Sequence, residues 1–361
     1  MRYLSLFLSL SILLASCATP TASPRPTATL PVVSTSIGEA TPLAPPTAPA
    51  ASTATSAPKT KVVFVTAGGA QAEAALAVIQ SAAQEFGWVS DWVQEAAPSA
   101  VETAAQSGAA VIVLDGPELE RGARAIAGNY PEAYFIGLHP GEGDLPANML
   151  AFGAPRYDQV GFIAGMIAGL TTKTKFVTGI GDPHSAEGLK YLNGFAHGVR
   201  YACPKCRIEG IDVTIQSSPT GQTAVVYAIS GCDVFFAAPG AAGKEALVAA
   251  AQEGAWVIGS DRDTPLTLFG GQAPEAEKVL TSVYLDPGAA LRSALAAFQA
   301  GAPPKGRQPL SASTGAIRLA PYNAPLEVFS ALDRQVIATA LGRLADGSLD
   351  TGIDPATGEE K

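Results

Sequence analysis

Lys61-Val-Val-Phe-Val-Thr66 is followed by Gly68-Gly69 and by an Ala-rich stretch from Gln71 to Phe86. The apolar run is typical of a strand buried on both faces, and the Ala-rich stretch predicts a helix after a glycine turn. We therefore expect the globular part of the chain to begin with a strand, a turn and a helix.

The same strand-and-helix unit recurs along the chain. Further strands are predicted at 110–114, 134–138, 175–180, 233–238 and 256–260, with helices from about 118, at 187–201 and at 244–253. Continuous apolar strands that alternate with amphipathic helices form parallel sheets covered on both faces. The pattern predicts a doubly wound α/β fold.

The order of these units predicts two lobes. Ala151-Phe-Gly-Ala-Pro155 interrupts the series before a Gly/Ala-rich helix at 157–170, and we place the first crossing between lobes there. Strand 279–285 and helix 287–300 are expected to resume the first lobe, and 315–319 with the helix after Pro325 to return to the second. We thus predict lobe 1 at 61–153 plus 264–301, lobe 2 at 154–263 plus 302–350, and a disordered tail at 351–361. Three crossings form a hinge on which the lobes close over a ligand at the carboxyl ends of their strands.

The amino-terminal sequence predicts export and lipid attachment. Arg2 precedes an apolar run at 4–14 that is too short to span a bilayer and ends in Leu14-Ala15-Ser16-Cys17. This is typical of a bacterial lipoprotein signal at 1–17, in which Cys17 becomes the lipid-modified first residue. An ordinary secretory signal is the alternative. Residues 18–60 are mostly Pro, Thr, Ala and Ser and predict a disordered tether, so we expect a protein anchored by lipid on the extracytoplasmic face of the cell membrane.

Composition and motifs exclude several classes of function. The chain is 47% hydrophobic and 15% charged, which is typical of a compact protein, and its net charge of −9 without a basic run argues against nucleic acid. Pro239-Gly-Ala-Ala-Gly-Lys244 superficially resembles a phosphate loop, but Ala238 and Glu245 stand where a Gly and a Ser or Thr are needed. No Gly-x-Ser-x-Gly or His-Glu-x-x-His motif occurs. We expect no enzyme, no cofactor and no metal.

Several glycine-containing motifs follow one another through the middle of the chain. They are Gly161-Phe-Ile-Ala-Gly165, Gly194-Phe195 with Gly198-Val199, Asp233-Val-Phe-Phe, Pro239-Gly240 to Gly243, Ile258-Gly-Ser-Asp-Arg-Asp263 and Val279-Leu-Thr-Ser282. Their order and spacing resemble the basic membrane lipoprotein (BMP) family, the PnrA-like nucleoside-binding lipoproteins, over residues 61–344. The resemblance implies a type I periplasmic-binding-protein fold and a monomeric receptor. Such a receptor delivers a nucleoside-like ligand to an ABC permease and its ATPase.

The chain also departs from the family pattern. After the first strand the family carries an acidic-polar-Phe-Asn segment, whereas this chain has Thr66-Ala-Gly-Gly-Ala70. Leu285 stands where the family tends to have a lysine, and His139 where it often has an acidic residue. We therefore expect the first lobe to lack ligand contacts that are usual in the family. A sensory or adhesive module that reuses the fold without transport is the alternative function.

The resemblance also assigns candidate ligand-binding residues. Asp261 corresponds to the family aspartate that accepts hydrogen bonds from sugar hydroxyls, although Asp at a strand end is also a common turn former. Asp263 is the next candidate. Further candidates end strands, lie at the crossing or let a ligand approach the backbone: Asp182, Asp115, Phe152, Gly240 and Gly243. Turn formation, core packing and helix–sheet packing are their structural alternatives.

Three cysteines follow the predicted signal. An oxidising compartment permits a disulfide, and we favour Cys206 with Cys232 because both precede strands expected to be neighbours. Cys203 with Cys206 is the competing pair. A zinc site that includes His197 and a redox motif are weaker alternatives.

Overall fold

The computed structural model describes residues 59–139, 141, 143–215, 219–271 and 273–361. The predicted signal at 1–17, with Cys17, and nearly all of the predicted tether at 18–60 lie outside the described residues. Within the described ranges, no helix combines the length and the apolar character that a membrane span requires.

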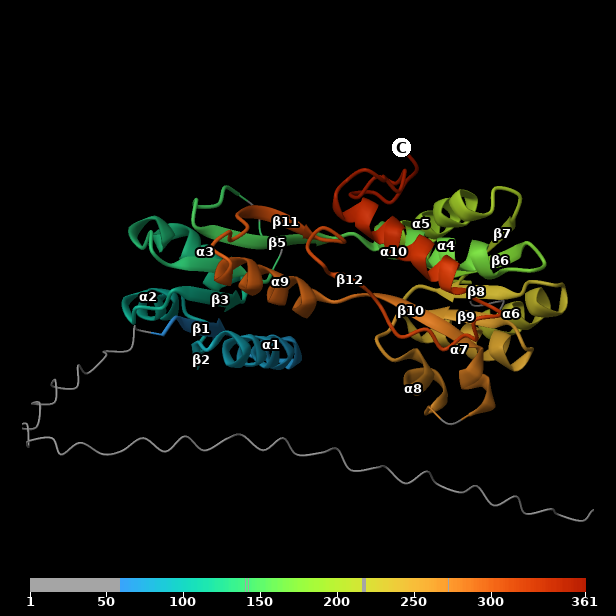
Figure 1. Cartoon of the computed structure of the whole chain (residues 1–361), viewed down its shortest axis with the longest axis horizontal. Coiled ribbons are helices and arrows are strands. Elements are labelled where there is room, and N and C mark those ends of the chain that lie inside the picture. The colour runs from blue at the N-terminus through green and yellow to red at the C-terminus, as the bar shows by residue number, and fades with distance from the viewer. Residues whose placement is uncertain (1–58, 140, 142, 216–218, 272) are drawn as a thin grey trace, which may run out of the picture. The chain divides into compact units, whose positions relative to one another are not determined.

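The first sheet is entirely parallel and has the strand order β11-β5-β4-β3-β1-β2 (Figure 1). Its strands are β1 (Lys61–Thr66), β2 (Val89–Gln94), β3 (Val111–Asp115), β4 (Tyr134–Gly137), β5 (Met149–Pro155) and β11 (Gly306–Leu310). The helices of this lobe are α1 (Ala70–Phe86), α2 (Ser99–Gln106), α3 (Pro117–Ile126), the 3₁₀ turn η1 (Ala127–Asn129) and α9 (Pro287–Gln299). α1 and α9 pack in one apolar cluster, and α2 and α3 in another. Both faces of the inner strands β1, β3, β4 and β5 are therefore covered, which explains their continuous apolar sequences. The edge strands β2 and β11 are more polar and more exposed.

The second sheet has the order β12-β10-β9-β8-β6-β7, with β12 antiparallel to β10 and the other strands parallel. Its strands are β6 (Phe176–Gly181), β7 (Arg207–Asp212), β8 (Val234–Ala237), β9 (Trp256–Gly259), β10 (Val279–Leu285) and β12 (Ile317–Leu319). The helices are α4 (Tyr157–Thr171), α5 (Ala186–Ala202), α6 (Thr220–Ile229), α7 (Ala241–Gln252), α8 (Thr264–Phe269), the 3₁₀ turn η2 (Pro274–Lys278) and α10 (Ala331–Ala345). The chain passes between the lobes after β5, after β10 and after β11 (Figure 1).

The observed lobes correct two of the predicted boundaries. The strand predicted at 279–285 in the first lobe is β10 of the second sheet, where it pairs with β9. The segment 306–310, predicted in the second lobe, is β11 of the first sheet, beside β5. A buried strand does not show in its sequence which sheet it joins. Here β10 joins the sheet of the strand before it in the chain, as consecutive strands usually do.

The carboxyl-terminal residues are folded, so the prediction of a disordered tail at 351–361 is wrong. Thr351 and Ile353 are buried, and Ile353 forms a β-bridge with Glu360. Asn193 of α5 donates a hydrogen bond of 2.7 Å to the Gly358 carbonyl oxygen. The sequence of this segment is mostly polar, so it does not indicate that a few of its residues face inward. Those residues pack the segment against the second lobe.

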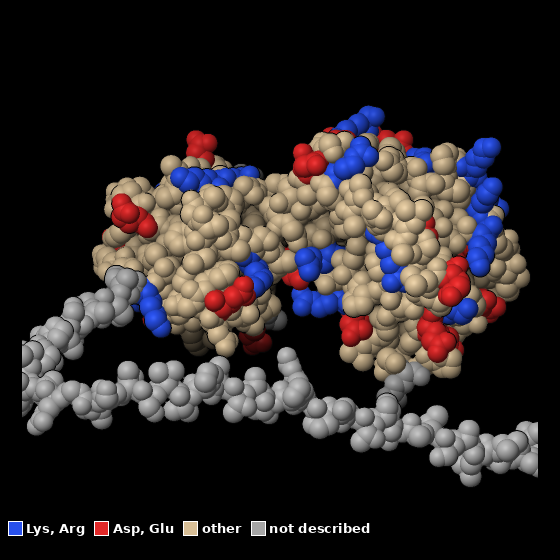
Figure 2. Space-filling model, in the orientation of Figure 1, with Lys and Arg blue, Asp and Glu red and all other residues tan. Residues whose placement is uncertain are grey.

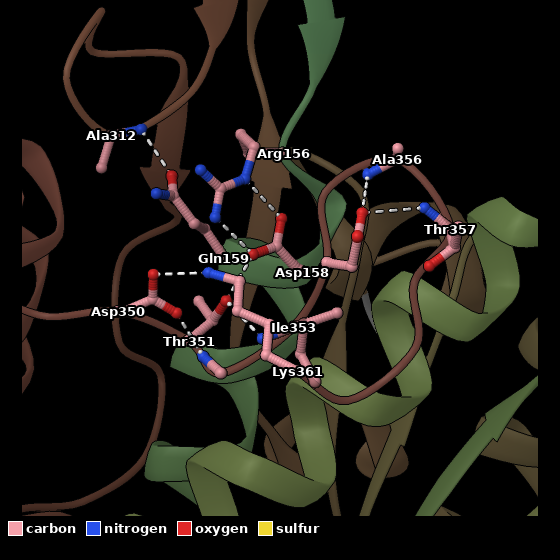
Figure 3. A network of polar contacts seen from close by, with 12 residues as sticks. Arg156, Asp158, Gln159, Ala312, Asp350, Thr351, Ile353, Ala356, Thr357 and Lys361 are labelled. Carbon is pink, nitrogen blue, oxygen red and sulfur yellow. Dashed lines mark hydrogen bonds and ion pairs between the residues drawn. The ribbon is translucent and has the colours of Figure 1, made fainter.

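A buried ion pair joins this carboxyl-terminal segment to the crossing between lobes (Figure 3). The Arg156 guanidinium donates hydrogen bonds of 2.7 Å to each carboxylate oxygen of the fully buried Asp158. Thr351 adds a third, from its hydroxyl to Asp158 Oδ2, at 2.6 Å. Gln159 Oε1 accepts a hydrogen bond of 2.9 Å from the Ala312 amide, which lies just after β11. The network thus connects two crossings and the chain end.

The glycine motifs in α4 and α5 allow these two helices to approach closely. A Cβ on Gly165 would lie 2.0 Å from the carbonyl oxygen of Phe195, and a Cβ on Gly198 would lie 1.9 Å from that of Phe162. Gly161 and Gly194 have similarly close backbone neighbours. These positions tolerate no side chain without separation of the helices, which places α4 in the core of the second lobe.

We predict that Gly165→Ala destabilises the protein, because the added methyl group meets backbone that cannot move alone. The free energy of unfolding should fall by about 1–3 kcal/mol or more in chemical denaturation. Gly342→Ala in α10 is the matched control, since a Cβ there has no neighbour within 4 Å. That change should stabilise the protein by about 0.5–1 kcal/mol. Equal effects at the two positions would show that α4 and α5 are not in close contact.

Candidate functional site

A cavity of about 700 Å³ lies where the two lobes meet. The first lobe contributes one face of α1, the β5 residue Phe152 and the start of α9. The second lobe contributes Ser260, Asp261 and Arg262 after β9, with the end of β10. Figure 2 shows basic side chains, in blue, beside acidic ones, in red, at the recess between the two halves of the described residues.

The turn after β9 fixes the position of Asp261. A Cβ on Gly259 would lie 1.8 Å from the Thr264 hydroxyl, so only glycine lets this turn fold back on α8. The buried Thr264 in turn accepts a hydrogen bond of 2.5 Å from Ser282 Oγ on β10. The motifs that contain Asp261 and Ser282 thus belong to one packed unit, and Asp261 lies at its edge toward the cavity.

Asp261 has a partner that the sequence analysis does not predict. The ammonium of Lys244, in the first turn of α7, lies 2.7 Å from Asp261 Oδ2. Both side chains are partly exposed, at 43% for Lys244 and 31% for Asp261. Parallel pairing of β8 with β9 brings the turns after these strands together, and this contact is visible only in the fold.

Two further candidates have structural roles. Asp263 is the N-cap of α8 and accepts a hydrogen bond from the Leu266 amide at 3.2 Å. Gly243 lies against the end of β8, where a Cβ would be 2.9 Å from the Ala238 carbonyl oxygen. Neither residue lines the cavity between the lobes.

The remaining candidates are placed differently. Gly240 is the N-cap of α7 and has φ of 148°, a backbone conformation that favours glycine. Asp182 accepts a hydrogen bond from the His184 amide at 2.8 Å. Phe152 packs in the core of the first lobe while it also lines the cavity. Of the seven candidates, the cavity brings together Asp261 and Phe152.

Asp115 belongs to a polar cluster at the carboxyl ends of β1, β3 and β4. The Thr66 hydroxyl donates to Asp115 Oδ2 at 2.8 Å, and His139 Nε2 lies 2.7 Å from Asp115 Oδ1. The His139 amide donates to the buried carboxylate of Glu120 at 2.6 Å, and burial raises the pKa of Glu120. The sequence marks His139 as a departure from the family. It does not show the partner, because Asp115 and His139 meet only through the pairing of β3 with β4.

Ion pairs balance the charged side chains around the cavity. Arg262 contacts Asp286 at 2.7 Å, and Arg292 of α9 is paired with Glu85 of α1. The Arg262 guanidinium also lies over the Tyr284 ring, 5.9 Å from its centroid. Sequence reasoning missed these pairs. Since each cation has an acidic partner, the cavity presents polar groups without a strong excess of either charge.

The cysteines correct the predicted pairing. The structure joins Cys203 to Cys206, with their Cα atoms 5.4 Å apart, and leaves Cys232 as a buried free thiol. The Cys206–Cys232 prediction is wrong because the short turn between α5 and β7 brings the first two cysteines together. Cys232 faces the core instead, 3.2 Å from the Thr178 hydroxyl. No cluster of three metal-ligating side chains occurs within the described residues.

Comparison with known proteins identifies both a family and a fold. The family model described as "ABC transporter substrate-binding protein PnrA-like" matches residues 68–331. Among solved structures, the chain is similar to an ABC transporter system solute-binding protein from Conexibacter woesei DSM 14684. The identity is 20%, the TM-score is 0.56, and the match covers 81% of this chain and 98% of that one.

The chain is similar as well to a transcriptional activator of the comK gene from Bacillus halodurans. Here the identity is 17%, the TM-score is 0.54, and the match covers 80% of this chain and 99% of that one. No curated protein matches the chain. At these identities the two structures show the fold alone, and the predicted type I periplasmic-binding fold of two parallel-sheet lobes is confirmed.

We predict that Cys232 resists alkylation in the native protein. Burial raises the pKa of its thiol to about 12, and the thiolate is the reactive form. Iodoacetamide at about pH 8 should modify Cys232 only after unfolding. Cys203 and Cys206 should be modified only after a reductant has cleaved their disulfide. Peptide mass spectrometry would follow each site. Alkylation of Cys203 or Cys206 without reductant would contradict the observed disulfide.

Proposed function

The chain belongs to the family of PnrA-like substrate-binding proteins of ABC transporters, and from this premise we propose that it is the ligand receptor of an ABC importer. It binds a small polar ligand in the cavity between its lobes and presents that ligand to a permease driven by an ATPase. The observation that carries the proposal is the position of Asp261, which lies at the wall of this cavity on the turn after β9.

The ligand that best suits this cavity is nucleoside-like. Asp261 provides a carboxylate for hydroxyl donors, and Phe152 provides an aromatic ring at the opposite lobe. The balanced ion pairs around the cavity favour a neutral molecule over an ion. In the first lobe, Thr66, Asp115 and His139 form a polar strand edge different from the acidic segment that is usual in the family.

We propose further that the receptor is held at the extracytoplasmic face of the cell membrane by lipid on Cys17. Support comes from the sequence Leu14-Ala15-Ser16-Cys17 after a short apolar run and from the Pro-, Thr- and Ser-rich residues after it. A tether of this composition gives the receptor reach while it stays near a permease.

Ligand binding tests the receptor function. Calorimetry with a panel of nucleosides, sugars and amino acids should identify a ligand, and Asp261→Ala should lower its affinity by about tenfold or more because a charge-assisted hydrogen bond is lost. Asp91→Ala is the matched control, because Asp91 lies on β2 and does not line the cavity. A protein that binds no small molecule would refute the receptor function. Unchanged affinity in Asp261→Ala would refute the role of this residue.

Metabolic labelling with a fatty acid tests the anchor. The wild-type protein should incorporate the label and fractionate with membranes, whereas Cys17→Ala should do neither, because the cysteine is the lipid acceptor. Cys232→Ala is the control, since that thiol is buried in the folded protein. Label that persists in Cys17→Ala would rule out lipid attachment at this residue.

A further inference from the structure

A second cavity lies inside the first lobe, where α9 packs beside β5 and β11 (Figure 1). Its volume is about 200 Å³. Four buried apolar side chains form its floor, those of Leu150, Phe152, Ala290 and Ala294. Ser293 and Ser313, which are exposed, lie at its mouth. The cavity is thus open to solvent on one side and apolar at its inner end.

Small residues of α9 leave this space unfilled. Ala290, Ala294 and Ala297 lie on one face of the helix, and all three line the cavity. Protein interiors are otherwise close-packed, so a larger side chain here would gain contacts with Leu150 and Phe152. An apolar cavity of about 150 Å³ holds a benzene molecule. The space in the first lobe therefore has room for one six-membered ring.

Gln308 places a polar side chain among these apolar walls. Along β11, the partly buried Gly306, Gln308 and Leu310 alternate with exposed residues, and Leu310 packs in the apolar cluster of this lobe. Gln308 lies on the same side and lines the cavity beside its strand neighbour Phe152. No described residue forms a hydrogen bond with its side-chain amide. A half-buried amide without a partner costs free energy, and a molecule in the cavity would remove that cost.

We propose that this cavity is a second binding site, which takes a small neutral molecule made of one ring and a carboxamide-like edge. The ring lies on the floor of the cavity, against Phe152. The edge exchanges two hydrogen bonds with Gln308, whose Nε2 donates to a carbonyl oxygen and whose Oε1 accepts from an N–H group. Among the described residues, none of those that line the cavity carries a charge. An ion would therefore lose its hydration without compensation, and the site excludes it.

This site goes beyond the receptor function proposed for the cavity between the lobes, because it requires no ligand there. The two cavities nevertheless share a wall, since Phe152 lines both. Phe152 lies on β5 and Gln308 on β11, and the chain crosses between the lobes after each of these strands. A molecule in the second cavity thus contacts two strands close to where they leave the first lobe.

NMR titration of the purified full chain would test the site with benzamide, toluene and benzoate as probes. Benzamide has the ring and the amide edge, and it should bind saturably with a dissociation constant of about 1 mM or lower. Toluene, which has the ring alone, should bind about tenfold more weakly, and the charged benzoate should not bind. Ala297→Leu fills the cavity and should lower the affinity for benzamide and toluene by about tenfold or more. Ala296→Leu is the matched control and should bind as wild type, because Ala296 is exposed on α9 and does not line the cavity.

Gln308→Leu separates the amide contact from the apolar space. Benzamide should bind this variant about tenfold more weakly than wild type, while the affinity for toluene should not fall. Absence of saturable benzamide binding, or equal affinity in Ala297→Leu and wild type, would overturn the site. Unchanged benzamide affinity in Gln308→Leu, or benzoate that binds as tightly as benzamide, would overturn the proposed ligand class. Thermal unfolding of each variant would show that lost binding is not lost folding.

Discussion

The buried ion pair between Arg156 and Asp158 is the constraint on which the arrangement of the chain depends. Burial of a carboxylate away from water costs several kcal/mol of folding free energy unless the charge is paired and its oxygens accept hydrogen bonds. Asp158 meets this requirement with two hydrogen bonds from Arg156 and one from Thr351. The Arg156 amide also donates to the Leu310 carbonyl oxygen at 2.9 Å. One buried charge thereby fixes the start of α4 against two crossings and the carboxyl-terminal segment.

The position of α4 determines the packing of the second lobe. Its glycines admit α5 at backbone contact, and α4 also packs against β10 and α10. β10 holds Ser282, which supports Thr264 beneath the Asp261 turn. The candidate ligand contact is thus the end of a chain of packed residues that begins at the crossing. This close packing requires glycine at two positions, because a Cβ on Gly165 or on Gly259 would overlap a neighbouring residue.

The sequence predicted the buried inner strands and the Ala-rich helices after glycine turns, because their apolar patterns are clear. It did not predict the edge strands β2 and β11, because their residues are more polar and more exposed. It failed where the outcome depended on long-range partners. The apolar pattern of 279–285 could not show which sheet it joins, and the polar residues around Ile353 concealed a packed segment. Asp261 could be named from the family resemblance together with its place at a strand end. Lys244 could not, since its contact exists only after β8 and β9 lie side by side.

The fold alone leaves the ligand open, because the same two-lobed architecture also occurs in a transcriptional activator. Discrimination must come from the few side chains that meet the ligand. In this chain, charged side chains that line the cavity are paired with opposite charges: Asp261 with Lys244, and Arg262 with Asp286. Asp286 lies between β10 and α9, so the second pair connects the Asp261 turn to the point where the chain enters the other lobe. The wall of the cavity at Asp261 is therefore connected, through the neighbouring Arg262, to the segment that joins the lobes.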